Sequence, residues 1–296
     1  MNEREFESMM EEIDAGLRGS QVPIHARAFQ AIADVSKRMK TELVVRLQPQ
    51  SEIVGRYDAS TLSAHIHAWC RERYGDRLKI RFGPGSVAIL IRGDAWRLEL
   101  PRVFGTARFA CDPDLEKYKG QRLLRQGQVQ PTYNVLNCID EFPSGLAASL
   151  SVEERKEILA VFHERFLDFA ALESIADRAY VKEALADLEA AVVHILSRPP
   201  QYGLSKWSSL QFVEKLLKSF LAGVGAPIPR KHNLAGIAKL AQANGLSPVG
   251  RASLGRIQCP AGVRYGEVRV TLQEAIAAHQ ESLAVSRSLA EQVRLT

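Results

Sequence analysis

The stretch that decides the fold reads SKWSSLQFVEKLLKSFL and covers residues 205–221. Its apolar side chains recur every three or four residues, at Trp207, Leu210, Val213, Leu217 and Phe220. That interval is the period of an α-helix with one buried face. We therefore expect a helix here, and a helix with such a stripe needs neighbouring elements to cover it.

Similar stripes predict four further helices in the same half of the chain. They begin at Ser151, cover 180–195 and 233–244, and resume at Thr271, where Thr271 and Glu274 have the spacing of a capping box. Five helices in so short a segment can bury their stripes only against one another. Residues 149–296 are thus expected to form a five-helix bundle.

The N-terminal half has a mixed pattern, so the fold class expected for the whole chain is α+β. Helical stripes lie within 6–17, 24–40 and 60–74, and strand-like runs occupy 42–47, 78–82, 87–92 and 96–100. Gly93-Asp94 suits a tight turn between the last two runs. We expect residues 1–148 to form a small α/β unit with an antiparallel meander, separated from the bundle near Pro143, Gly145 and Ser151.

Composition limits the class of protein. The chain has 296 residues, of which 46% are hydrophobic, enough for a core without disulfides or metal. The first residues do not form a signal peptide, the longest apolar run is Val87–Ile91, and the four cysteines are scattered without C-x-x-C pairs. We therefore expect a cytoplasmic protein with no membrane contact, no metal and no cofactor. The net charge of +5 permits an anionic partner without requiring one.

Three short blocks carry polar groups that suit ligand binding. Glu214-Lys215-x-x-Lys218 lies on the central helix, His232-Asn233-Leu234 opens the next helix, and Arg264-Tyr265-Gly266-Glu267 precedes the last one. Cations beside an aromatic ring are suited to a nucleotide or an RNA phosphate. The candidate ligand-binding residues are Gln211, Glu214, Lys215, Lys218, Arg230, His232, Arg264 and Tyr265.

The three blocks, in this order, resemble the HEPN superfamily, in the branch that accompanies small nucleotidyltransferases. The resemblance covers about residues 175–289. It implies a HEPN-like, non-enzymatic protein that binds a nucleotide, RNA or a protein partner, as a homodimer, in a toxin–antitoxin or phage-defence system. If the family geometry holds, the candidate groups converge on one groove of the bundle.

Two alternative functions stay open. Ribonuclease members of the superfamily carry an Arg, then four to six residues, then a His on one helix, and that spacing occurs here only from Arg18 to His25, with Pro23 inside. A metal-independent endoribonuclease with a degenerate site would have to use His232 and Arg264 as its catalytic pair. The other alternative is a dimeric scaffold with no ligand, because the resemblance implies a bundle of a kind that commonly pairs. The stripe from Phe6 to Leu17 also needs a surface to cover it, which favours self-association.

The candidate residues also have purely structural interpretations. Glu214 and Lys218, four residues apart on a helix, are typical of an ordinary ion pair. His232 suits a cap, and Arg264 suits an anchor that ties its turn to a carboxylate such as Glu214. Trp207 is expected in the core.

Overall fold

A computed structural model describes residues 1–43, 55–78, 83–103, 105–114, 132–230 and 232–296. The chain forms two compact units, Met1–Arg81 and Phe82–Thr296, each described separately below. Helices predominate and short β-strands accompany them, so the expected α+β class is confirmed. The expected strands at 42–47 and 78–82 fall almost wholly outside the described residues.

The elements described in the first unit are all helices. It contains α1 (Glu3–Gly19), α2 (Ile24–Met39) and α3 (Leu62–Tyr74), followed by the short helix η1 (Gly75–Leu78). The apolar stripe of α1 packs into a core shared with α2 and α3, where Phe6, Ile13 and Leu17 are buried. This stripe is covered within its own unit, so it no longer argues for a second copy of the chain.

The second unit opens with a β-hairpin. Strands β1 (Gly85–Ile91) and β2 (Asp94–Leu100) pair antiparallel, with Ile91 opposite Asp94. Arg92 and Gly93 form the turn with φ of 52° and 88°, the left-handed geometry that tight hairpins favour and that glycine adopts without strain. The strands expected at 87–92 and 96–100 are confirmed as this hairpin, but the turn expected at Gly93-Asp94 lies one residue earlier, because Asp94 already pairs with Ile91.

A second strand pair was not expected from the sequence. Strand β3 (Arg108–Ala110) pairs in parallel with β4 (Thr132–Asn134), and the short helix η2 (Val135–Cys138) follows. Three-residue strands are too short for a periodic signal, and their pairing joins residues far apart in the sequence. They are therefore visible only in the folded chain.

All five expected helices of the C-terminal half are present. They are α5 (Val152–Glu173), α6 (Val181–Leu196), α7 (Tyr202–Gly223), α8 (Leu234–Ala243) and α10 (Leu272–Arg294). Reciprocal capping boxes start α5 at Ser151 and α10 at Thr271. The sequence missed the short helices α4 (Ser144–Ala148), α9 (Arg251–Ile257) and η3 (Ala261–Tyr265), which are too short to show a stripe.

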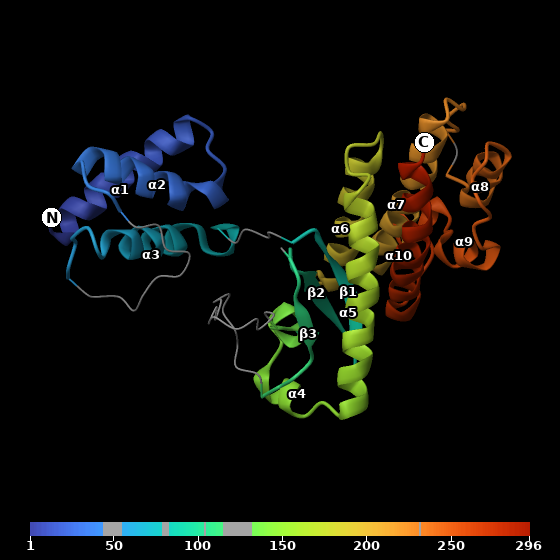
Figure 1. Cartoon of the computed structure of the whole chain (residues 1–296), viewed down its shortest axis with the longest axis horizontal. Coiled ribbons are helices and arrows are strands. Elements are labelled where there is room, and N and C mark those ends of the chain that lie inside the picture. The colour runs from blue at the N-terminus through green and yellow to red at the C-terminus, as the bar shows by residue number, and fades with distance from the viewer. Residues whose placement is uncertain (44–54, 79–82, 104, 115–131, 231) are drawn as a thin grey trace. The chain divides into compact units, whose positions relative to one another are not determined.

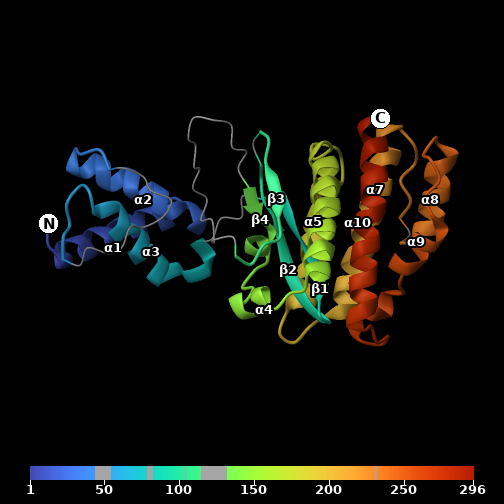
Figure 2. The same cartoon turned by 60° about the horizontal axis from the view of Figure 1, so that its bottom comes forward.

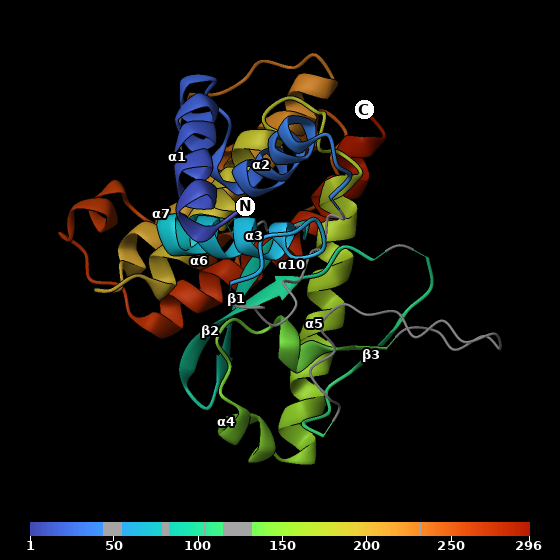
Figure 3. The same ribbon diagram turned by 90° about the vertical axis from the view of Figure 1, so that its left-hand side faces the viewer.

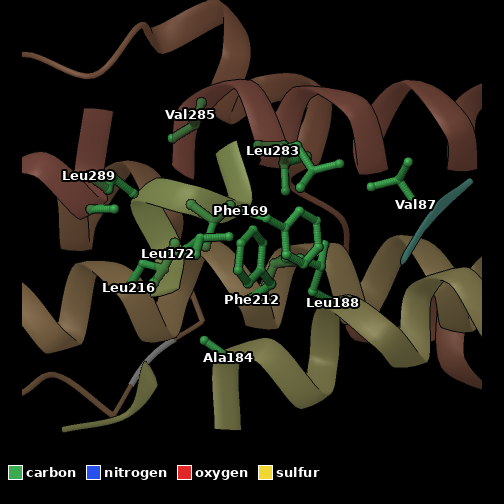
Figure 4. Close-up of a cluster of buried hydrophobic side chains, with 14 of the residues drawn as sticks. Val87, Phe169, Leu172, Ala184, Leu188, Phe212, Leu216, Leu283, Val285 and Leu289 are labelled. Carbon is green, nitrogen blue, oxygen red and sulfur yellow. The ribbon is translucent and has the colours of Figure 1, made fainter. Parts of the chain in front are cut away.

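Helix α7 is the centre of the second unit. It packs against α6 and α10 along its length, and Phe212 and Leu216 are fully buried between them. Figure 4 shows Phe212 in one buried cluster with side chains from α5, α6 and α10, among them Phe169, Leu188 and Leu283. Helices α8 and α9 form an outer layer on α7 and α10, on the side away from the hairpin (Figures 1 and 2).

The hairpin belongs to the same unit as the helices, which differs from the expected boundary at 148/149. Val87 and Leu98 are buried in the core that also holds Phe162 of α5. Figure 3 shows β1 and β2 running beside α5. The backbone N–H of Ala88 donates to Nε2 of buried His279 on α10 at 3.2 Å. Because of these long-range contacts, the two units divide at 81/82 and the hairpin belongs to the second unit.

Fragments of the chain distinguish the two boundaries. A fragment of residues 82–296 should unfold cooperatively on heating, because it retains the hairpin and every helix that shares its core. A fragment of residues 149–296 should bind a hydrophobic dye and lose cooperativity, because removing the hairpin exposes apolar surface of α5 and α6. Cooperative unfolding of the shorter fragment with the stability of the longer one would restore the boundary at 148/149.

His279 should make stability depend on pH. Complete burial, with Arg165 nearby, lowers the pKa of His279 from 6.5 to about 3. The folded state therefore keeps this imidazole neutral, whereas the unfolded chain takes up a proton below pH 6.5. Stability should be complete above pH 6.5 and fall by about 1.4 kcal/mol per pH unit between 6.5 and 5.

The matched variant is His279→Gln, whose amide oxygen can accept from Ala88 and does not titrate. Urea unfolding of both proteins at pH 7.5, 6 and 5 checks this. The difference between their free energies of unfolding should shrink or reverse as the pH falls. A constant difference across this range would contradict the account.

Candidate functional site

The site is built on one face of α7. Trp207, Gln211, Glu214 and Lys218 are spaced by three or four residues, so their side chains lie one above another along the helix. The opposite face is buried in the core. The position of this polar face is therefore fixed by the packing of the apolar one.

A buried carboxylate, Glu214, is the centre of the site. Its side chain is 2% exposed. Oε1 accepts from Nζ of Lys218 at 2.7 Å, and Oε2 accepts from Nδ1 of His232 at 2.8 Å. The side-chain amide of Gln211 lies 3.4 Å from Oε2 and 3.3 Å from Nδ1 of His232. These partners offset the cost of removing the charge from water.

The pairing with Glu214 selects the tautomer of His232. A carboxylate can only accept, so Nδ1 carries hydrogen, and in this tautomer of the imidazole Nε2 has a lone pair. The side chain is 52% exposed. The loop is held as well, because Gln258 donates to the carbonyl of His232 at 3.2 Å and accepts from the N–H of Leu234 at 2.9 Å. The imidazole is thus a fixed group at the surface.

Trp207 joins His232 to the third block. The His232 ring meets it edge to face, with centroids 5.5 Å apart. The guanidinium of Arg264, in η3, lies 5.1 Å from the Trp207 centroid and 5.4 Å from that of Tyr265. Tyr265 is 69% exposed. Arg264 therefore stacks on aromatic rings and does not anchor its turn to Glu214, as one interpretation of the sequence expected.

Two candidate residues lie apart from this group. Lys215 forms an ion pair with Asp187 of α6, and its Nζ lies 3.5 Å from the carbonyl of Glu183. Arg230 is exposed and has no ion pair within the part of the chain that the structure describes. Lys231, next to it, lies outside the described residues. The structure thus connects Gln211, Glu214, Lys218, His232, Arg264 and Tyr265, with Trp207 between them.

The charges of the site are largely compensated. Lys218 is neutralised by Glu214 and Lys215 by Asp187, while burial raises the pKa of Asp187, against the pull of Lys215. Arg264 has no carboxylate partner among the described residues. It is therefore the main cation of the site available to a ligand.

Sequence reasoning missed two residues that hold the site together. Trp207 is half-buried: it packs against the core and also contacts the exposed side chains of His232 and Arg264. Its position four residues before Gln211 on the polar face of the helix was the available signal. Gln258, which fixes the loop at His232, gave no signal, because its partners lie more than twenty residues away.

Other features of the described residues do not point to a different centre. A hollow of about 450 Å³ lies at the end of β2 beside η2, and none of the candidate residues lines it. Within the described ranges, no group of three His, Cys, Asp or Glu residues is arranged to hold a metal ion. In the same ranges no helix has the length and apolar character needed to cross a membrane.

Comparisons with known proteins add no relative. The chain matches no protein-family model, no curated protein and no solved structure.

Removing the buried carboxylate should destabilise the protein strongly. In Glu214→Ala the ammonium of Lys218, 14% exposed, has no counter-charge, and breaking one side of a buried pair costs about 3–5 kcal/mol. Adding Lys218→Met removes the stranded charge and should recover part of this loss. Urea unfolding of the two single variants and the double variant measures the coupling.

The control is Lys215→Ala, which breaks a more exposed pair and should cost about 1 kcal/mol or less. Strictly additive effects of Glu214→Ala and Lys218→Met would show that the two side chains do not depend on each other.

Proposed function

We propose that the surface of Trp207, His232, Arg264 and Tyr265 binds a nucleotide unit of RNA, or a free nucleotide, without cleaving it. The observation that carries this proposal is the stacking of the Arg264 guanidinium on two rings, one of which, Tyr265, is 69% exposed. The ligand in this proposal provides a flat base for stacking and an anionic group for Arg264.

Each part of the surface has a matching role in this proposal. An exposed aromatic ring stacks on a base with about 1–3 kcal/mol per base. A guanidinium held flat against rings keeps its N–H groups free at its edges, where they can donate to phosphate oxygens. The lone pair on Nε2 of His232 accepts from a base or ribose hydroxyl. Because the lysines are already neutralised, few charges compete for the ligand.

The wider setting is proposed from the resemblance of the three sequence blocks. In this proposal the second unit is a HEPN-like bundle, and the protein acts in the cytoplasm as a homodimer within a toxin–antitoxin or phage-defence system. Helices α5, α6, α8 and α10, which share a core with α7, are compatible with it.

A second candidate function is metal-independent RNA cleavage, and the Glu214–His232 contact favours it. A carboxylate that holds Nδ1–H leaves Nε2 as a base, which can take the proton from a ribose 2′-hydroxyl. Arg264, which flanks the same tryptophan ring, would then stabilise the charge on phosphorus. The leaving oxygen also needs a general acid, and the Tyr265 hydroxyl beside Arg264 is held by no hydrogen bond among the described residues, so we favour binding.

Changes at the aromatic surface should weaken RNA binding. Tyr265→Ala removes one stacking ring and should lower the affinity for a labelled oligouridylate about 5- to 150-fold, whereas Tyr265→Phe should bind normally. Arg264→Ala should lower it about 10-fold or more, through loss of a charged hydrogen bond. Fluorescence anisotropy at fixed salt measures these affinities.

Tyr180→Ala is the matched control, since Tyr180 is also exposed but lies at the start of α6. Equal loss of affinity in the Tyr180 and Tyr265 variants would refute the proposed surface.

RNA incubated with the protein separates the two functions. We expect the RNA to remain intact in the presence of a chelator. Cleavage that disappears in His232→Ala, while RNA binding persists, would replace binding by catalysis as the function.

A further inference from the structure

The segment that follows Glu214 has an unusual charge distribution. No Asp or Glu occurs between Glu214 and Glu267, while the same stretch contains Lys215, Lys218, Arg230, Lys231, Lys239, Arg251, Arg256 and Arg264. Outside this stretch the chain has 31 basic and 34 acidic residues, so the two kinds of charge are nearly balanced there. This stretch includes the outer layer of helices α8 and α9.

Helices α8 and α9 extend away from the candidate site as a helical pair. Gln258, just after α9, accepts from Leu234 at the start of α8, so the end of α9 meets the start of α8 beside His232. At the other end, the N–H of Ser247 donates to Gln292 near the end of α10. At 1.5 Å per residue, the ten residues of α8 extend the surface by about 15 Å.

The cations on this pair are exposed and mostly unpaired. Lys239 on α8 and Arg251 at the start of α9 are exposed, and neither has an ion pair within the described part of the chain. Arg256 reaches Glu281 of α10 at 2.8 Å, so one cation is offset. The layer therefore presents positive charge that the protein itself does not compensate.

We infer that the α8–α9 layer is the second half of the binding surface and holds the backbone of a single-stranded nucleic acid. This inference rests on the proposed function, and it identifies the ligand as a strand of several nucleotides. The aromatic group at Trp207 and Tyr265 takes one base. The phosphates that follow it lie along Lys239 and Arg251.

Charge complementarity selects this occupant. A mononucleotide reaches only Arg264 and the groups beside it, and gains nothing from Lys239 and Arg251, which lie more than one helical turn farther along α8 and α9. A strand places a negative charge at every nucleotide, and each lysine or arginine that meets a phosphate releases counterions. Binding through the layer must therefore increase with oligonucleotide length and weaken with salt.

The test compares a dinucleotide with a twelve-residue oligouridylate, using the full chain and fluorescence anisotropy at several salt concentrations. The wild type should bind the longer RNA at least about 10-fold more tightly. In Lys239→Ala/Arg251→Ala the salt slope for the longer RNA should decrease in magnitude by about 0.7 for each side chain removed. Its affinity for the dinucleotide should not change.

The matched control is Lys156→Ala/Lys182→Ala, which removes two exposed cations from α5 and α6 and should leave both affinities intact. Equal affinity for the two RNA lengths, or an unchanged salt slope in the α8–α9 variant, would overturn the inference while the proposed function stands. If Arg264→Ala and Tyr265→Ala bind the longer RNA with the affinity of the wild type, the proposed function is overturned instead.

Two further outcomes also count against the inference. If polyglutamate of equal charge competes as well as RNA, the layer recognises acidic protein. If the wild type binds neither RNA length, both the proposed function and the inference fail.

Discussion

One buried carboxylate organises the region that we assign to ligand binding. Glu214 is 2% exposed and is stable there only because Lys218 and His232 both reach it. That requirement fixes three things together: the direction of the lysine, the tautomer of the histidine and the approach of the loop before α8. The outward surface of Trp207, His232 and Arg264 depends on this arrangement beneath it.

Helix α7 links this polar centre to the stability of the whole unit. One side of the helix carries Phe212, Leu216 and Leu217 into the core, where α6 and α10 cover them. The other side carries Trp207, Glu214 and Lys218. A site on a helix that is packed along its length changes little in shape, so a ligand meets groups already in position. The same packing includes the β-hairpin, which makes the hairpin part of this unit.

How much the sequence predicted depended on the distance between partners. Helical stripes and capping boxes are local, and the helices from Ser151 and Thr271 were found in place. The pairing of Glu214 with Lys218 also follows from their spacing of four residues. The contact of Glu214 with His232 spans eighteen residues and an irregular loop, so no periodicity could give its geometry.

The boundary expected at 148/149 differs from the division of the structure at 81/82 for the same reason. A change from alternating to helical periodicity suggested a division near Ser151. The contact of Ala88 with His279 joins residues 191 positions apart, and no local pattern records it. The role of Trp207 was missed for another reason. A tryptophan in an apolar stripe predicts burial, and the pattern does not show that part of the ring remains at the surface.

The three tryptophans allow a direct test of the central claim, that ligand binds at Trp207 beside the Glu214–His232 pair. Trp69 lies in the first unit and Trp96 in the hairpin, so only Trp207 belongs to the proposed surface. An NMR titration of the ¹⁵N-labelled full chain with a uridine dinucleotide follows all three indole N–H signals, with Trp207→Phe for assignment. We predict that the Trp207 signal shifts saturably while those of Trp69 and Trp96 stay in place. No shift, or a shift confined to Trp69 or Trp96, would contradict the account.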